Sequence, residues 1–185
     1  MKQYKFSSMG KQKLKSFEHG HDSGTTVDAH ASDDSSHTSA TYSDAAVSEL
    51  LYMIEEEKLA GDIYEAFYDL YGVKIFDNIA QSEDKHFDAL IQVADSLDID
   101  TDQFVLADAG EFTNPELQEM YDTLLAEGSE SLTDALEVGL AIEEKDMVDI
   151  AAAIEDVEGT QLAEVYDNLL TGSSYHLDAF ALMLA

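Results

Sequence analysis

Apolar residues recur at helical spacing from Ser43 to the end of the chain, and no stretch alternates with the period of a strand. Asn114 and Pro115 are a typical helix cap and first-turn proline. Ser131, with Asp134 three residues later, resembles a capping box. These signals predict an all-α fold. The expected helices span residues 44–71, 75–97, 115–127, 132–157 and 160–184.

The spacing of these helices indicates their topology. Gly72 and Gly159 leave only short links inside each pair of long helices, which predicts two antiparallel hairpins. The connection between the hairpins, residues 98–131, is long enough to cross a bundle and contains the short helix. We therefore expect a ferritin-like four-helix bundle over residues 44–185, with two antiparallel hairpins joined by a long crossover with a short extra helix.

Residues 1–43 form a polar N-terminal tail without hydrophobic periodicity. Its first 17 residues hold five lysines and no acid, whereas residues 45–185 hold 34 acids and four lysines of a chain with net charge −31. This charge favours solubility in a salty environment and is also compatible with attraction of cations. It argues against a nucleic-acid partner, because the acidic domain would repel phosphate.

Residues 76–90 and 166–180 are copies of one pattern and align without a gap. His86 and His176, the only histidines outside the tail, occupy the same position of this repeat. A duplicated helix that keeps an inward histidine suggests a pseudo-twofold metal site inside a helical bundle.

On a helical wheel, each long helix turns a potential metal ligand toward its apolar face at mid-length. Glu55 and Glu56 fall outside that face. An unpaired buried carboxylate is costly, so several of them in one core point to a neutralising cation. The candidate ligands are Glu57, Glu83, His86, Glu143, Asp146 and His176.

The chain has no cysteine, so a metal would need carboxylate and imidazole ligands, which suit iron, manganese or zinc. Ser173 stands where the repeat has Glu83. Asp146, one turn beyond Glu143, could replace the missing carboxylate; otherwise water fills the position, or the site holds one metal. Taken singly, the histidines could instead be hydrogen-bonded core residues, and Glu57 part of a solvated glutamate run.

Several segments resemble the rubrerythrin branch of the ferritin-like superfamily. Residues 57–64, EKLAGDIY, look like its first-helix segment, and residues 80–90, AQSEDKHFDAL, look like its Glu-x-x-His segment. Residues 47–184 are most similar to a prokaryotic ferritin-like domain family of unknown function. The resemblance implies a non-haem di-iron carboxylate site. Its ligands would be Glu57, Glu83, His86, Glu143 and His176.

The resemblance favours an iron-dependent oxidoreductase or ferroxidase, which oxidises Fe(II) or reduces O₂ or peroxide. Because the chain has no cysteine to hold an electron-transfer iron, a peroxidase cycle would need an external electron donor. The alternative is a structural, self-assembling protein whose metal is structural or absent and whose N-terminal tail links the subunits of a homo-oligomer. A third possibility is metal storage in a closed cage.

No stretch of the sequence approaches the ~18 apolar residues of a membrane span. The basic N-terminus lacks the apolar region of a standard secretory signal. We therefore expect no membrane span and take a cytoplasmic location as the default, with extracellular surface assembly left open.

Overall fold

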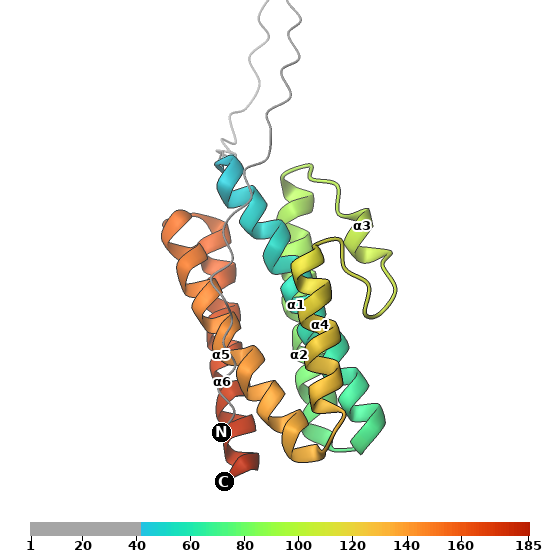
Figure 1. Cartoon of the computed structure of the whole chain (residues 1–185). Helices are drawn as coiled ribbons and strands as arrows, with labels where there is room; N and C mark the ends of the chain where they lie inside the picture. Colours follow the sequence, from blue (N-terminus) through green and yellow to red (C-terminus); the bar gives the residue numbers. More distant parts are fainter. Residues whose placement is uncertain (1–41) are drawn as a thin grey trace, which may run out of the picture. The chain divides into compact units, whose positions relative to one another are not determined.

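The computed structural model describes residues 42–185, which form a set of α-helices (Figure 1). The predicted tail, residues 1–43, lies outside the described residues apart from its last two positions. Across residues 42–185 there is no β-strand, and none of the helices there is long and apolar enough to span a membrane. The helices are α1 (Asp44–Tyr71), α2 (Lys74–Ser96), α3 (Asp102–Val105), α4 (Pro115–Gly128), α5 (Leu132–Asp156) and α6 (Gln161–Leu184).

The ends of the helices follow from capping residues in the sequence. At the start of α5, the Ser131 hydroxyl accepts the backbone N–H of Asp134 at 3.2 Å, as the capping-box pattern predicts. The Asn114 side chain caps α4. α1 ends at Gly72, whose φ of 64° lies in the left-handed region that favours glycine. The predicted boundaries of the five helices are therefore confirmed to within one residue.

The four long helices form two pairs, α1 with α2 and α5 with α6. α1 packs most extensively on α2, and α5 packs most extensively on α6. Only Gly72 and Val73 separate α1 from α2, so the two helices run antiparallel (Figure 1). The hairpins meet where α1 contacts α5 and α2 contacts α6, and α4 packs on α1 and α5. The connection also contains α3, which was not predicted because a single turn is too short to show helical periodicity.

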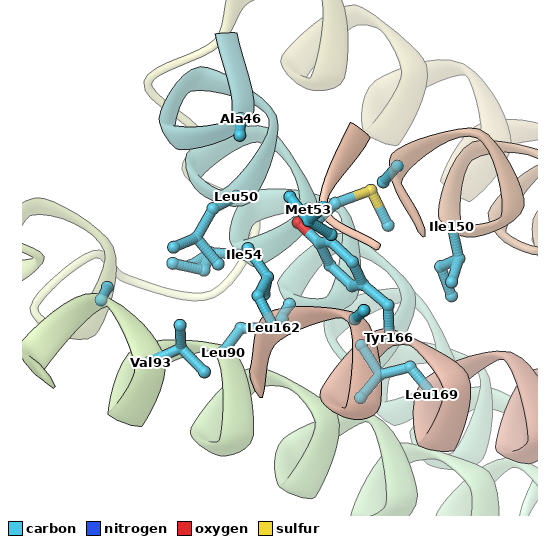
Figure 2. Packing of buried hydrophobic residues seen from close by; sticks show 14 of the residues in the cluster. Ala46, Leu50, Met53, Ile54, Leu90, Val93, Ile150, Leu162, Tyr166 and Leu169 are labelled. Atoms are coloured by element: carbon cyan, nitrogen blue, oxygen red, sulfur yellow. The ribbon is translucent and has the colours of Figure 1, made fainter. Parts of the chain in front are cut away.

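The apolar core consists of two clusters. Figure 2 shows the first cluster, in which Leu50, Leu90 and Tyr166 bring together α1, α2 and α6. The second cluster is aromatic and includes Phe76 and Phe180, whose ring centroids are 5.8 Å apart. Burial of each such side chain stabilises the fold by about 1.5–3 kcal/mol. On every long helix, buried polar residues lie between the positions that feed the two clusters, and most of these residues form the candidate site.

Candidate metal centre

A layer of buried polar residues lies at mid-length of the four long helices. Its members are Glu57 from α1, Glu83 and His86 from α2, Glu143 and Asp146 from α5, and Ser173 and His176 from α6. The side chains of His86 and His176 keep 12% and 11% of their surface exposed, and the other members are more deeply buried. The six residues proposed as ligands from the sequence therefore all lie in this layer.

Glu83 lies at the centre of the layer and belongs to two groups of potential ligands. In the first group Glu83 meets Glu57 and His86, and in the second it meets Glu143 and His176. Within each group, one ligand atom per residue lies within 4.8 Å of the others. Glu83 is thus the one residue that the two groups have in common.

The two oxygens of Glu83 face the two histidines. Glu83 Oε2 is 2.8 Å from His86 Nδ1, and Glu83 Oε1 is 2.8 Å from His176 Nδ1. The two imidazole rings stack with centroids 5.6 Å apart and an angle of 28° between their planes. The two histidines, which occupy the same position of the sequence repeat, therefore lie on either side of one carboxylate.

Several ligand atoms in this layer have no hydrogen-bond partner. Glu83 Oε1 and His176 Nδ1 are close to each other but lack the alignment of a hydrogen bond, and Glu57 Oε1 is also unpartnered. Buried polar atoms are almost always paired, since leaving one unpaired costs about 1–3 kcal/mol. Carboxylate oxygen with imidazole nitrogen is a donor set that suits iron, manganese or zinc.

Burial and neighbouring charges shift the pKa values of the acids and histidines in the layer. Burial favours the neutral form of Glu83, but the two histidines outweigh it and lower the pKa of Glu83 to about 2. Burial and the charge of Glu83 raise the pKa of Glu143 to about 7. They also raise the pKa of Glu57 well above its usual range. Burial opposes the charged form of His176, yet Glu143 and Glu83 raise its pKa to about 9. Glu57, Glu143 and His176 therefore tend to hold protons, which they would have to release in order to bind a metal ion.

Tyr64 on α1 orients one of the acids. Its hydroxyl donates to Glu143 Oε1 at 2.6 Å and lies 3.4 Å from the carbonyl oxygen of Gly139. The other oxygen, Glu143 Oε2, is left facing His176 Nδ1 at 3.5 Å. Tyr64 therefore occupies one oxygen of Glu143, Oε1, and leaves the other, Oε2, facing the layer.

Gly172 on α6 gives His86 its space. A Cβ atom at this position would lie 2.6 Å from His86 Nε2, which is closer than real Cβ contacts come. The imidazole therefore packs directly against the backbone of α6 while its Nδ1 faces Glu83 and Glu57. The sequence analysis missed this role, because a glycine one residue before Ser173 gives no signal of a close approach from another helix.

Asp146 lies in the layer but outside both ligand groups. Its Oδ2 accepts a hydrogen bond from the Ser173 hydroxyl at 2.6 Å, and its Oδ1 is buried without a partner. The three acids of α6, Glu164, Asp167 and Asp178, are exposed. No carboxylate of α6 therefore enters the layer.

The prediction that Glu55 and Glu56 fall outside the buried face is wrong, since they are only 4% and 3% exposed. Glu55 accepts the backbone N–H groups of Thr113 and Asn114 in the connection before α4. Glu56 pairs with the ammonium group of Lys145 on α5. A wheel assumes one buried face, but α1 is covered by α2, α4 and α5 together. Lys145 is a second residue that the sequence analysis missed. Its rarity was the available signal, because residues 45–185 contain only four lysines.

The fold and this site define an all-helical domain with a buried layer of carboxylates and histidines. Residues 46–185 match the family described as "Uncharacterized protein domain (DUF2202)", and the chain belongs to this family.

Two comparisons give relatives of this chain. It is 39% identical to "Uncharacterized protein MJ0754" of Methanocaldococcus jannaschii over 135 residues, which are 73% of this chain and 72% of the relative. Its fold is similar to that in "Crystal structure of hypothetical protein MJ0754 from Methanococcus jannaschii DSM 2661", with a TM-score of 0.75 and 36% identity. That match covers 81% of this chain and 85% of the solved one.

Proposed function

We propose that the helical domain is a ferritin-like four-helix bundle that binds a pair of metal ions, with iron as the proposed metal and manganese or zinc as alternatives. The observation that carries the proposal is the sharing of Glu83 by two groups, each with its own histidine and second carboxylate. The family match and its relatives support the common fold and state no activity.

The proposed function is oxidation of Fe(II) or reduction of O₂ or peroxide within the bundle. Iron in the layer would supply the electrons for such a reduction. Glu57 and Glu143 would each add a negative charge on either side of Glu83, and His86 and His176 would add one nitrogen ligand each. The hydrogen bond from Tyr64 would keep Glu143 Oε2 directed toward the ions.

The surroundings of the layer support chemistry that must exclude bulk water. The two apolar clusters lie on either side of it, and Glu57, Glu83 and Glu143 are each at most 2% exposed. The Glu143 carboxyl and the His176 imidazole would lose their protons when a metal binds, so binding should strengthen as pH rises. A catalytic cycle that consumes electrons would require an external donor, since the chain has no cysteine-ligated redox centre.

The test is anaerobic loading with Fe(II) followed by O₂ or peroxide, with near-ultraviolet absorbance recorded against time. We expect an absorbance change that Glu83→Ala and His86→Ala abolish. Asp88→Asn, an exposed acid on the same helix, is the matched control and should behave as wild type. A wild type without any absorbance change, or variants that match it, would refute the proposal.

The alternative function is structural assembly, in which the N-terminal tail, residues 1–43, links subunits. The charge distribution along the chain is the observation that suggests it. The five lysines of residues 1–17 are opposite in sign to the domain of residues 45–185. Replacing these lysines with serine in the full chain should lower the mass found by light scattering at low salt if the tail links subunits. An unchanged mass would exclude this role.

A further inference from the structure

We propose that Asp146 is a metal ligand that the Ser173 hydroxyl holds in position, so that α5 supplies the carboxylate that α6 lacks. This inference rests on the proposed metal site and specifies its ligand set. It concerns residues that lie outside the two groups formed around Glu83.

The internal repeat gives the first part of the argument. Aligning residues 76–90 with 166–180 places Ser173 opposite Glu83 and His176 opposite His86. Both histidines have kept their places and reach the same carboxylate. A full copy of the repeat would therefore have a carboxylate at the position of Ser173, where α6 has none.

The geometry supplies that carboxylate from the neighbouring helix. The Ser173 hydroxyl lies 2.6 Å from Asp146 Oδ2 and 3.0 Å from the carbonyl oxygen of Leu169, and the shorter contact is to the acid. Ser173 is fully buried and Asp146 is 5% exposed. A hydroxyl hydrogen bond on one oxygen fixes the carboxylate and leaves Oδ1 as the atom that can bind a cation.

A purely structural role does not account for this residue. No ion pair of Asp146 is found within residues 42–185, and the adjacent Lys145 is turned toward Tyr52, Glu56 and Asp149 instead. If the only task were to accept a hydrogen bond from Ser173, an asparagine would serve without adding a fourth acid to a layer that already holds Glu57, Glu83 and Glu143. The unpartnered oxygen therefore indicates a cation ligand.

The experiment is a titration of the full chain with Co(II), followed by calorimetry and by visible absorption, which reports on the ligands of cobalt. Asp146→Asn keeps the shape and the acceptor for Ser173 but removes the carboxylate. We expect a weakening of binding by at least about tenfold and a changed cobalt spectrum. Glu144→Gln, an exposed acid two residues away, is the control and should match wild type.

A rescue variant separates ligation from a general loss of charge. Combining Asp146→Ser with Ser173→Glu moves the carboxylate from α5 to α6, where the repeat has Glu83, and roughly conserves the total side-chain volume. This double variant should regain tight binding, whereas Asp146→Ser alone should not. Equal affinity and spectrum for Asp146→Asn and wild type would overturn the inference, as would a folded double variant that binds as weakly as Asp146→Ser. A wild type that binds no Co(II) would refute the metal site itself.

Discussion

Replacing Lys145 with methionine is expected to destabilise the helical domain by about 3–5 kcal/mol at pH 8, the usual cost of removing one partner of a buried ion pair. The Lys145 ammonium contacts Glu56 Oε1, Asp149 Oδ2 at 2.5 Å and the Tyr52 hydroxyl at 2.9 Å. Its side chain is 12% exposed, and that of Glu56 is 4% exposed. Methionine retains the aliphatic packing, so the loss measures the charge interaction.

The same substitution should make stability depend more steeply on pH. Burial, partly offset by Lys145, raises the pKa of Glu56 from 4.5 to about 7, and removing the lysine should raise it further. An acid with a raised pKa in the folded state favours folding at low pH, and this contribution is lost as pH rises from about 4.5 through the folded value. The cost of Lys145→Met should therefore be smaller at pH 5 than at pH 8.

Urea denaturation followed by far-ultraviolet circular dichroism measures both effects. The double variant Glu56→Gln with Lys145→Met should be clearly more stable than Lys145→Met, since it leaves no unpaired buried carboxylate. Lys74→Met is the matched control, because the Lys74–Asp77 pair lies on the surface, and it should leave the midpoint unchanged. A small cost for Lys145→Met at pH 8, or additive effects in the double variant, would refute this reasoning.

Three further predictions concern the layer. Tyr64→Phe should cost about 1.5–3 kcal/mol in urea denaturation, because the buried Glu143 loses a hydrogen bond; an unchanged midpoint would contradict this. Gly172→Ala should push the His86 ring away and weaken Co(II) binding in calorimetry by about tenfold or more, and undiminished affinity would disprove the close approach. In metal-free protein, the unfolding free energy should fall as pH rises from about 4.5 to 9, because the pKa values of Glu143 and His176 are raised to about 7 and about 9 in the folded state. Urea titrations of chelator-treated protein at several pH values measure this free energy. A value that rises with pH over this range would contradict the prediction.

The sequence allowed the long helices and most of the layer to be predicted, for two physical reasons. Capping residues mark helix ends locally, as Ser131 and Gly72 do. An acid on an apolar face, such as Glu83, breaks a periodic pattern and is visible without a structure. The repeat then identified His86 and His176 as partners, and the structure places both against Glu83.

Contacts between helices could not be predicted in the same way. The burial of Glu55 and Glu56 depends on α4 and α5 covering α1 from other directions. The sequence suggested Asp146 as a substitute for the carboxylate missing at Ser173, but the hydrogen bond between them depends on the relative register of α5 and α6, which no single-helix pattern contains. The space that Gly172 leaves for His86 is a property of α2 against α6. In each case the signal lies between elements, where a wheel drawn for one helix has no information.

The charges inside the domain lead to one conclusion about the layer. Lys145 pairs with Glu56 Oε1 and offsets its charge, so Glu56 is not counted with the acids of the layer. Glu57, Glu83, Glu143 and Asp146 remain, and only His86 and His176 can offset them within the layer. Even with both histidines protonated, an excess of carboxylates is left, which has to be met by bound protons or by a cation. The raised pKa values of Glu57, Glu143 and Asp146 correspond to the first solution. A cation would release those protons and leave the acids ionised, which is why proton release on metal binding and the pH dependence of metal-free stability should be two measures of the same buried charge.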